Sequence, residues 1–294
     1  LTEVLPSLHS LEKLSLSIAE FDDECERQLF AAIRNLGWLK ELKLIVYCDT
    51  ELVTGAFPEA LISLQLLEKL TFQGQFDDSE DQKLFVAALR SLKYLKELYL
   101  DIHLGNQTQE TLAEVLPSLK WLENLVLKTE VVLKQVPAAL GLLKYLKKLK
   151  LSQCDIAEDS AESLAEVLPS LQFLESLVIK ACFRNGSEKQ VFVALQSLKY
   201  LKKLKLYCYG SAKDSAETLA EVLSSLQLLE KLTLRGLDFS SNSDQLLFTA
   251  VPWLSYLKTL VLRSTEISPA GARNLTAVLP TLRNLTFIYF PEIQ

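Results

Sequence analysis

The side chains best suited to acid–base or nucleophilic chemistry are few and scattered in this sequence. Its two histidines, His9 and His103, lie far apart, and its five cysteines form no CxxC pair. No HExxH, GxSxG, GxGxxG or glycine-rich phosphate-binding motif is present. We therefore predict that the chain is not an enzyme and holds neither a metal nor a cofactor.

A second kind of chemistry, the binding of anionic groups, is indicated by basic residues at regular spacings. Lys203 and Lys205 lie in the segment KLKL, which returns as KLTL at Lys231. Side chains two apart on a β-strand point to the same face, so such residues would gather on one surface. The candidate partner-binding residues are Lys128, Lys148, Lys150, Lys180, Lys203, Lys205, Tyr207, Lys231, Arg235 and Arg263.

The elements that must position these residues belong to a repeat with the pattern LxxLxL. Eleven copies follow one another at a spacing of about 28 residues, a length typical of repeats that stack into solenoids. The first leucines of the copies are Leu11, Leu39, Leu67, Leu95, Leu122, Leu146, Leu174, Leu201, Leu229, Leu257 and Leu285. One interval, from Leu122 to Leu146, is shorter than the others. The pattern predicts a solenoid, in which each unit buries its apolar side against its neighbours.

Each repeat contains two hydrophobic periods. The last two leucines of the motif alternate as in a strand, whereas Leu219, Val222, Leu223 and Leu226 have the spacing of one helix face. Strands stack about 4.8 Å apart and helices are about 10 Å wide. We therefore predict an α/β horseshoe with a parallel sheet on its concave face and helices on its convex face.

The repeats resemble the leucine-rich repeat family, of the helical type found in ribonuclease inhibitor and in NOD-like receptors. The most typical stretch is LKKLKLSQCDIAEDSAESLAEVLPSL, residues 146–171. The resemblance covers residues 1–294 and implies one leucine-rich repeat domain, truncated at its N-terminus and capped at residues 283–294. It further implies the ligand-sensing or autoinhibitory region of an intracellular immune receptor, where other domains of the receptor would be partners.

The positions between the leucines point to the concave face and differ in charge along the chain. The first four repeats carry three basic and three acidic residues there, but repeats five to ten carry nine basic residues and no acidic one. Removing nine positive charges from the net charge of −6 leaves −15 elsewhere. The expected partner is a protein with an acidic surface, and Val126, Val178 and Val261 are expected to add apolar contact area.

Other partners and functions fit the sequence less well or remain open. A sequence pI of about 5.2 disfavours nucleic acid, and no apolar run is long enough to cross a membrane. An odd number of thiols favours a reducing, cytoplasmic location. Lysines that simply solvate the surface, an enzyme inhibitor like ribonuclease inhibitor, an activator of a GTPase, and a designed or consensus scaffold are the alternatives.

Two further columns run along the repeats. The residue after the first leucine alternates between Glu and Lys from Glu12 to Lys258, which predicts a ladder with each carboxylate between two ammonium groups. Aromatic residues precede the motif and are expected to pack ring against ring along the loop edge, with a binding stripe as the alternative. They are Trp38, Tyr94, Trp121, Tyr145, Phe173, Tyr200 and Tyr256.

Overall fold

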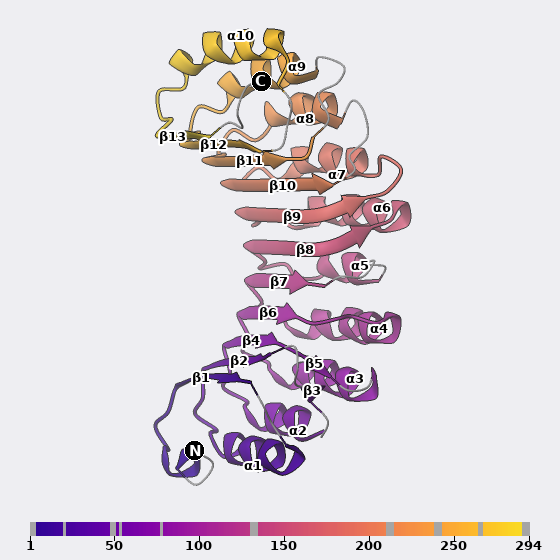
Figure 1. The fold of residues 1–294 in the computed structure, drawn as a ribbon, viewed down its shortest axis with the longest axis vertical. Helices are drawn as coiled ribbons and strands as arrows, with labels where there is room; N and C mark the ends of the chain where they lie inside the picture. Colours follow the sequence, from indigo (N-terminus) through magenta and orange to yellow (C-terminus); the bar gives the residue numbers. More distant parts are fainter. Residues whose placement is uncertain are drawn as a thin grey trace. The chain divides into compact units, whose positions relative to one another are not determined.

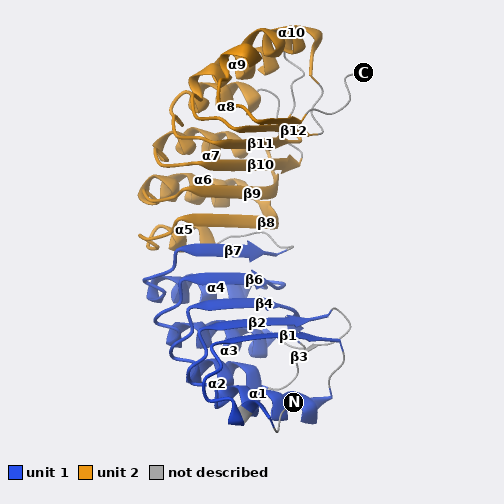
Figure 2. Ribbon diagram, turned by 90° about the vertical axis from the view of Figure 1, so that its left-hand side faces the viewer, with its two compact units in different colours: residues 1–131 blue, residues 132–294 orange. Residues whose placement is uncertain are grey.

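The computed structural model divides the chain into two compact units, residues 1–131 and residues 132–294 (Figure 2). The structure describes residues 4–19, 22–47, 51–52, 55–76, 79–129, 135–209, 215–237, 243–263 and 267–289. Cys48 and the last five residues of the predicted C-terminal cap lie outside these ranges. The curvature predicted for the whole chain stays a prediction.

Unit 1 is a parallel sheet with helices along one side (Figure 1). Its strands pair in chain order. They are β1 (Lys13–Ile18), β2 (Glu41–Val46), β4 (Lys69–Gln73), β6 (Glu97–Asp101) and β7 (Asn124–Lys128). The helices are α1 (Asp23–Arg34), α2 (Ala56–Ser63), α3 (Ser79–Ala88) and α4 (Asn106–Val115), and two short strands, β3 (Glu51–Leu52) and β5 (Gln75–Phe76), pair separately. Short 3-10 helices lie at Leu5–Ser7, Leu89–Ser91 and Leu116–Ser118.

Unit 2 has the same plan, again with parallel strands in chain order. Its strands are β8 (Lys148–Ile156), β9 (Ser176–Phe183), β10 (Lys203–Tyr209), β11 (Lys231–Arg235), β12 (Thr259–Arg263) and β13 (Phe287–Tyr289). Its helices are α5 (Val136–Leu140), α6 (Glu158–Val167), α7 (Glu188–Ala194), α8 (Ser215–Leu223), α9 (Ser243–Ala250) and α10 (Pro269–Val278). Short 3-10 helices lie at Leu168–Ser170, Leu195–Ser197, Val251–Trp253 and Leu279–Thr281.

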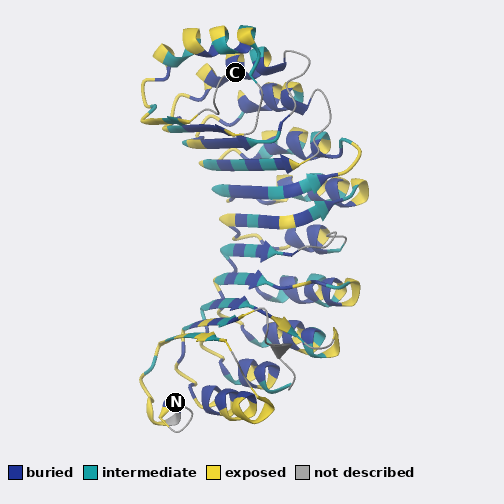
Figure 3. Cartoon of the chain, viewed as in Figure 1, coloured by how far each residue is buried: buried dark blue, intermediate teal, exposed yellow. Residues whose placement is uncertain are grey.

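The leucines of the motif set this arrangement. Leu204 and Leu206 are fully buried, and Leu204 has Leu232 of the next strand as its Cα partner. The residues that alternate with these leucines, Lys203, Lys205 and Tyr207, are only half-buried. Such alternation gives the strands their alternating colours in Figure 3. Leu219 and Leu223 of α8 are also fully buried. The predicted strands, the helix face and the register of one repeat per strand are therefore confirmed.

The shortened repeat between Leu122 and Leu146 has the shortest described α-helix, as its sequence predicts. Helix α5 has five residues, and Pro137 lies in its first turn, where proline removes no intrahelical hydrogen bond. Residues 130–134 of this repeat lie outside the described ranges.

A cluster of phenylalanines fills the core of unit 1. The ring centroid of Phe57 lies 4.8 Å from that of Phe30, 5.2 Å from that of Phe72 and 5.2 Å from that of Phe85. All four rings are essentially unexposed. These residues come from α1, α2, β4 and α3, so the cluster ties three successive repeats together.

The charged column beside the leucines forms separate pairs rather than the continuous ladder expected. Four carboxylates of this column each pair with the ammonium group of the following repeat, over 2.6 Å in Glu12–Lys40 and 2.7 Å in Glu68–Lys96. Glu175–Lys202 at 3.1 Å and Glu230–Lys258 at 2.9 Å repeat this in unit 2. Glu68 reaches Lys40 only at longer range, so the carboxylate is not shared equally.

Candidate functional site

The face of each sheet opposite the helices, which we call the open face, carries the residues singled out above. Nine of the ten candidate residues lie on the open face of unit 2. We call these nine the basic face: Lys148, Lys150, Lys180, Lys203, Lys205, Tyr207, Lys231, Arg235 and Arg263. The tenth, Lys128, lies at the end of β7 in unit 1.

The strand register arranges the basic face in rows that cross the strands. In one row Lys203 is the Cα partner of Lys231, so two ammonium groups occupy neighbouring strands. In another row Arg235 is the partner of Arg263, with Tyr207 on the other side of Arg235. Like charges on neighbouring strands destabilise a sheet, so this arrangement favours an anionic partner.

Most of these cations form no ion pair with a carboxylate of the described residues. Among the described residues, no acidic group lies within ion-pair distance of seven members of the basic face. These seven are Lys148, Lys180, Lys203, Lys205, Lys231, Arg235 and Arg263. An acidic residue of strand β8, Asp155, is held by Arg184, whose Nη2 donates to Oδ2 over 2.6 Å. The open face of unit 2 therefore carries an excess of positive charge.

Lys205 is at the centre of this excess. It lies between Val178 and Thr233 in its row, and both of these shorter side chains are almost completely buried. Burial of the amine is the main cause that lowers the pKa of Lys205, and repulsion from Lys203 and then Lys180 lowers it further. An anion placed at this point would relieve the repulsion.

Aromatic rings hold several of the cationic groups in place. The ammonium nitrogen of Lys180 lies 4.7 Å from the ring centroid of Tyr207. The guanidinium of Arg235 lies 5.8 Å from the ring of Tyr209, and that of Arg263 lies 5.0 Å from the ring of Tyr289. Each such contact contributes about 0.5–1 kcal/mol at an exposed site. The basic groups are therefore partly ordered before any partner arrives.

Tyr209 and Tyr289 were not among the candidate residues, although the sequence contains a signal for each. Tyr289 occupies the open-face position of the last repeat, and Tyr209 extends the alternation of β10 by two residues. Their side chains are 47% and 43% exposed, so both are available to a partner.

The valines expected to add apolar contact area lie mostly beneath their neighbours, which corrects that prediction. Val178 is 7% exposed and Val261 is 9% exposed. Val178 lies between Lys150 and Lys205 in the register, and long side chains on both sides cover a short one. Only Val126, on β7 of unit 1, stays half-exposed.

Lys128 differs from the basic face in its environment. Its ammonium group donates to Oδ2 of Asp101 on the preceding strand over 2.8 Å, and both side chains are partly buried. The charge of Lys128 is therefore already neutralised by its own unit.

Two rings of the aromatic column, Phe173 and Tyr200, are exposed and do not pack against an aromatic neighbour as expected. Phe173 is 55% exposed and Tyr200 is 57% exposed. Neither ring contacts another described aromatic ring. The expected packing is therefore absent at these two positions of the column.

Within the described ranges, no three His, Cys, Asp or Glu side chains gather as metal ligands would. Over the same ranges, no helix combines the length and the apolar character that crossing a membrane requires.

Parallel strands in chain order, buried leucines at each LxxLxL motif and helices on one side define a leucine-rich repeat architecture. No family profile and no curated protein matches the sequence. Among solved structures, an internalin (InlF) from Listeria monocytogenes is similar, with 15% identity and a TM-score of 0.44. The similarity covers 99% of this chain and 89% of that chain. An architecture of this kind is typical of protein-binding modules.

Proposed function

We propose that the chain is a non-catalytic protein-binding module and that the basic face of unit 2 binds an acidic surface of its partner. The observation that supports this most directly is the group of seven cations without a described carboxylate, in a chain whose net charge is −6. Such segregation of charge steers an acidic partner towards one face.

The tyrosines of the open face support a protein partner in particular. Tyr207, Tyr209 and Tyr289 lie among the cations, and tyrosine and arginine are enriched where protein interfaces bind tightly. The acidic remainder of the chain would repel nucleic acid outside this face.

The test compares two variants with equal changes in net charge. The first replaces Lys148, Lys180, Lys203 and Lys231 with Glu, and the second replaces Lys93, Lys120, Lys144 and Lys199 with Glu. The second set is exposed and lies outside the open faces. Partners captured from a lysate are identified by mass spectrometry and then titrated individually by calorimetry.

We expect the first variant to lose the main partner and the second to retain it, after circular dichroism has established that both fold. Binding of the purified partner should weaken as salt rises from about 50 to about 300 mM, because salt screens exposed charges. Equal loss in both variants would attribute the binding to net charge alone. Retention by both would contradict the proposal.

We also propose that residues 1–294 act as one leucine-rich repeat domain of the helical, ribonuclease-inhibitor-like type in a cytoplasmic immune receptor. The helical repeats and their resemblance to NOD-like receptors support this role. The described cysteines, Cys25, Cys154, Cys182 and Cys208, are free thiols, in keeping with a reducing compartment. The test is the sequence upstream of Leu1 in the gene: a domain with a GxxxxGK[ST] loop is expected there, and its absence would contradict the receptor role.

A further inference from the structure

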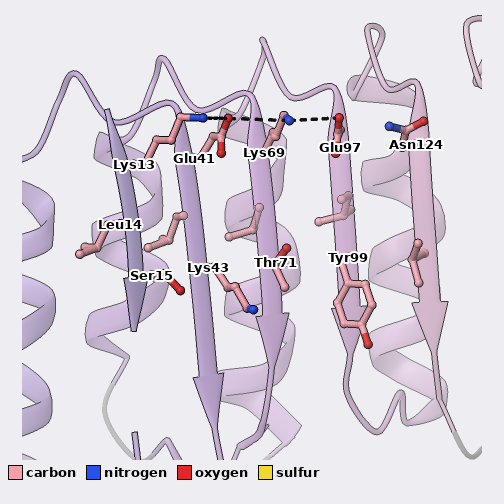
Figure 4. Close-up of a pocket in the computed structure, with 14 residues that line it drawn as sticks. Lys13, Leu14, Ser15, Glu41, Lys43, Lys69, Thr71, Glu97, Tyr99 and Asn124 are labelled. Carbon is pink, nitrogen blue, oxygen red and sulfur yellow. Dashed lines mark ion pairs between the residues drawn. The ribbon is translucent and has the colours of Figure 1, made fainter. Parts of the chain in front are cut away.

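The open face of unit 1 contains a hollow that differs in character from the basic face. It has a volume of about 510 Å³ and is lined by strands β1, β2, β4, β6 and β7 (Figure 4). This size is within the range of small-molecule sites, about 300–1,000 Å³. The side chains that line it are arranged in two rows across the strands.

The first row neutralises itself. Lys13 and Glu41 are 2.9 Å apart, Glu41 and Lys69 are 3.7 Å apart, and Lys69 and Glu97 are 3.4 Å apart. The hydrogen bond from Lys13 is the main cause that lowers the pKa of Glu41, and attraction to Glu97 is the main cause that raises the pKa of Lys69. This chain of ion pairs, drawn as dashed lines in Figure 4, requires no ligand.

The second row is different, because its positive charge is not paired with any carboxylate of the described residues. The register places Lys43 between Ser15 on β1 and Thr71 on β4, with Tyr99 next along the row. Among the described residues, no carboxylate lies within ion-pair distance of Lys43. The hydroxyl groups of Ser15 and Thr71 likewise have no hydrogen-bond partner within the described part of the chain.

These groups suit one kind of anion. A single ammonium group flanked by two hydroxyl donors matches the charge and the acceptors of one carboxylate. A phosphate dianion is disfavoured, because Lys43 supplies one positive charge and the other two lysines of the hollow, Lys13 and Lys69, already pair with Glu41 and Glu97. Beside the cation, the ring of Tyr99 and the half-exposed Val126 offer apolar surface to the body of the ligand.

We propose that the hollow of unit 1 binds a carboxylate carried on an apolar stem, with Lys43 as the charge partner and Ser15 and Thr71 as hydrogen-bond donors. The carboxylate could belong to a free organic acid or to an acidic side chain of a peptide. This site lies on residues outside the basic face, so it is independent of the proposed partner-binding function.

The experiment is a titration followed by NMR of the backbone amides of the full chain. The probes are 3-phenylpropionate, its uncharged amide 3-phenylpropanamide, acetate, inorganic phosphate and N-acetylglutamate amide. The phenylpropionate and glutamate probes distinguish a free acid from a peptide side chain. The variant is Lys43→Gln, and the matched control is Lys93→Gln, another exposed lysine of unit 1 without an ion pair among the described residues.

We expect 3-phenylpropionate or N-acetylglutamate amide to shift the amides of Ser15, Lys43, Thr71 and Tyr99 saturably, with a Kd of about 1 mM or tighter. Lys43→Gln should weaken this binding about tenfold, a charge-assisted contact being worth about 1.5–3 kcal/mol, while Lys93→Gln leaves it unchanged. Equal binding of the uncharged amide, tighter binding of phosphate, unchanged binding to Lys43→Gln, or no saturation by either carboxylate at about 10 mM would each overturn the proposal.

Discussion

The ammonium group of Lys180 lies over the ring of Tyr207, 4.7 Å from its centroid and on the neighbouring strand. On its other side, Tyr207 is the Cα partner of Arg235 on the next strand, β11. Tyr207 therefore stands between two cations that lack described carboxylates, and it limits where at least one of them can point.

Replacing Tyr207 tests whether this order contributes to binding. We expect Tyr207→Ala to weaken binding of an acidic partner about two- to fivefold, the equivalent of a cation–π contact of about 0.5–1 kcal/mol. Tyr207→Phe retains the ring and should bind within twofold of the original protein, by calorimetry. If the two variants bind alike, the ring does not position the cation.

The pKa of Lys205 gives a second prediction, measured by NMR of the side-chain amines over a pH series. Burial and neighbouring cations lower this pKa from 10.5, so Lys205 should lose its proton at a lower pH than an ordinary lysine. The unfolded chain keeps that proton to higher pH. Stability should therefore rise as pH increases through the folded pKa of Lys205 towards 10.5.

An acidic partner on the basic face should reverse this shift. A glutamate-rich peptide at saturating concentration is expected to raise the pKa of Lys205, because it favours the charged amine. An unchanged pKa in the presence of bound peptide would place the peptide elsewhere.

Gly236, directly after β11, has a backbone conformation that only glycine adopts easily. Its φ is +73°, and an added Cβ would lie 2.3 Å from the carbonyl oxygen of Cys208. Gly236→Ala should therefore lower the free energy of unfolding by about 1–3 kcal/mol. Gly37→Ala is the control, since nothing lies within 4 Å of its Cβ position. Urea denaturation of both variants measures the difference, and equal midpoints would contradict the expectation.

The phenylalanine cluster predicts a large effect at Phe57. Phe57→Ala removes a ring that contacts three others and should cost about 3–5 kcal/mol of stability. Phe173→Ala, at an exposed ring in unit 2, should change stability by less than about 0.5 kcal/mol. Thermal unfolding followed by circular dichroism distinguishes the two, and a mild effect at Phe57 would argue against a tightly packed cluster.

The fold could be predicted from the sequence because the decisive signal is periodic and local. Leu204 and Leu206 alternate with Lys203 and Lys205, and this alternation indicates which side chains face the helices. The repeat length then sets the register, since the same position of each repeat must meet its copy on the next strand.

The burial and ion pairing of the site residues depend on the side chains beside them on adjacent strands. Comparing the repeats position by position does not reveal these neighbours. The burial of Val178 follows from the length of Lys150 and Lys205 beside it. The pairing of Lys128 with Asp101 required the two to be compared as neighbours in one row. The unpaired charge of Lys43 likewise becomes visible only after the ion pairs around it are assigned.

The pairing of Glu12 with Lys40 and of Glu68 with Lys96 has a consequence for how such a chain can change in length. Each pair joins one repeat to the next, and the following two repeats form a separate pair of the same kind. Deleting or duplicating two consecutive repeats would leave every ammonium group with a carboxylate, whereas losing a single repeat would set like charges side by side. We therefore expect such a chain to change its length in steps of two repeats, the stretch that separates Leu39 from Leu95.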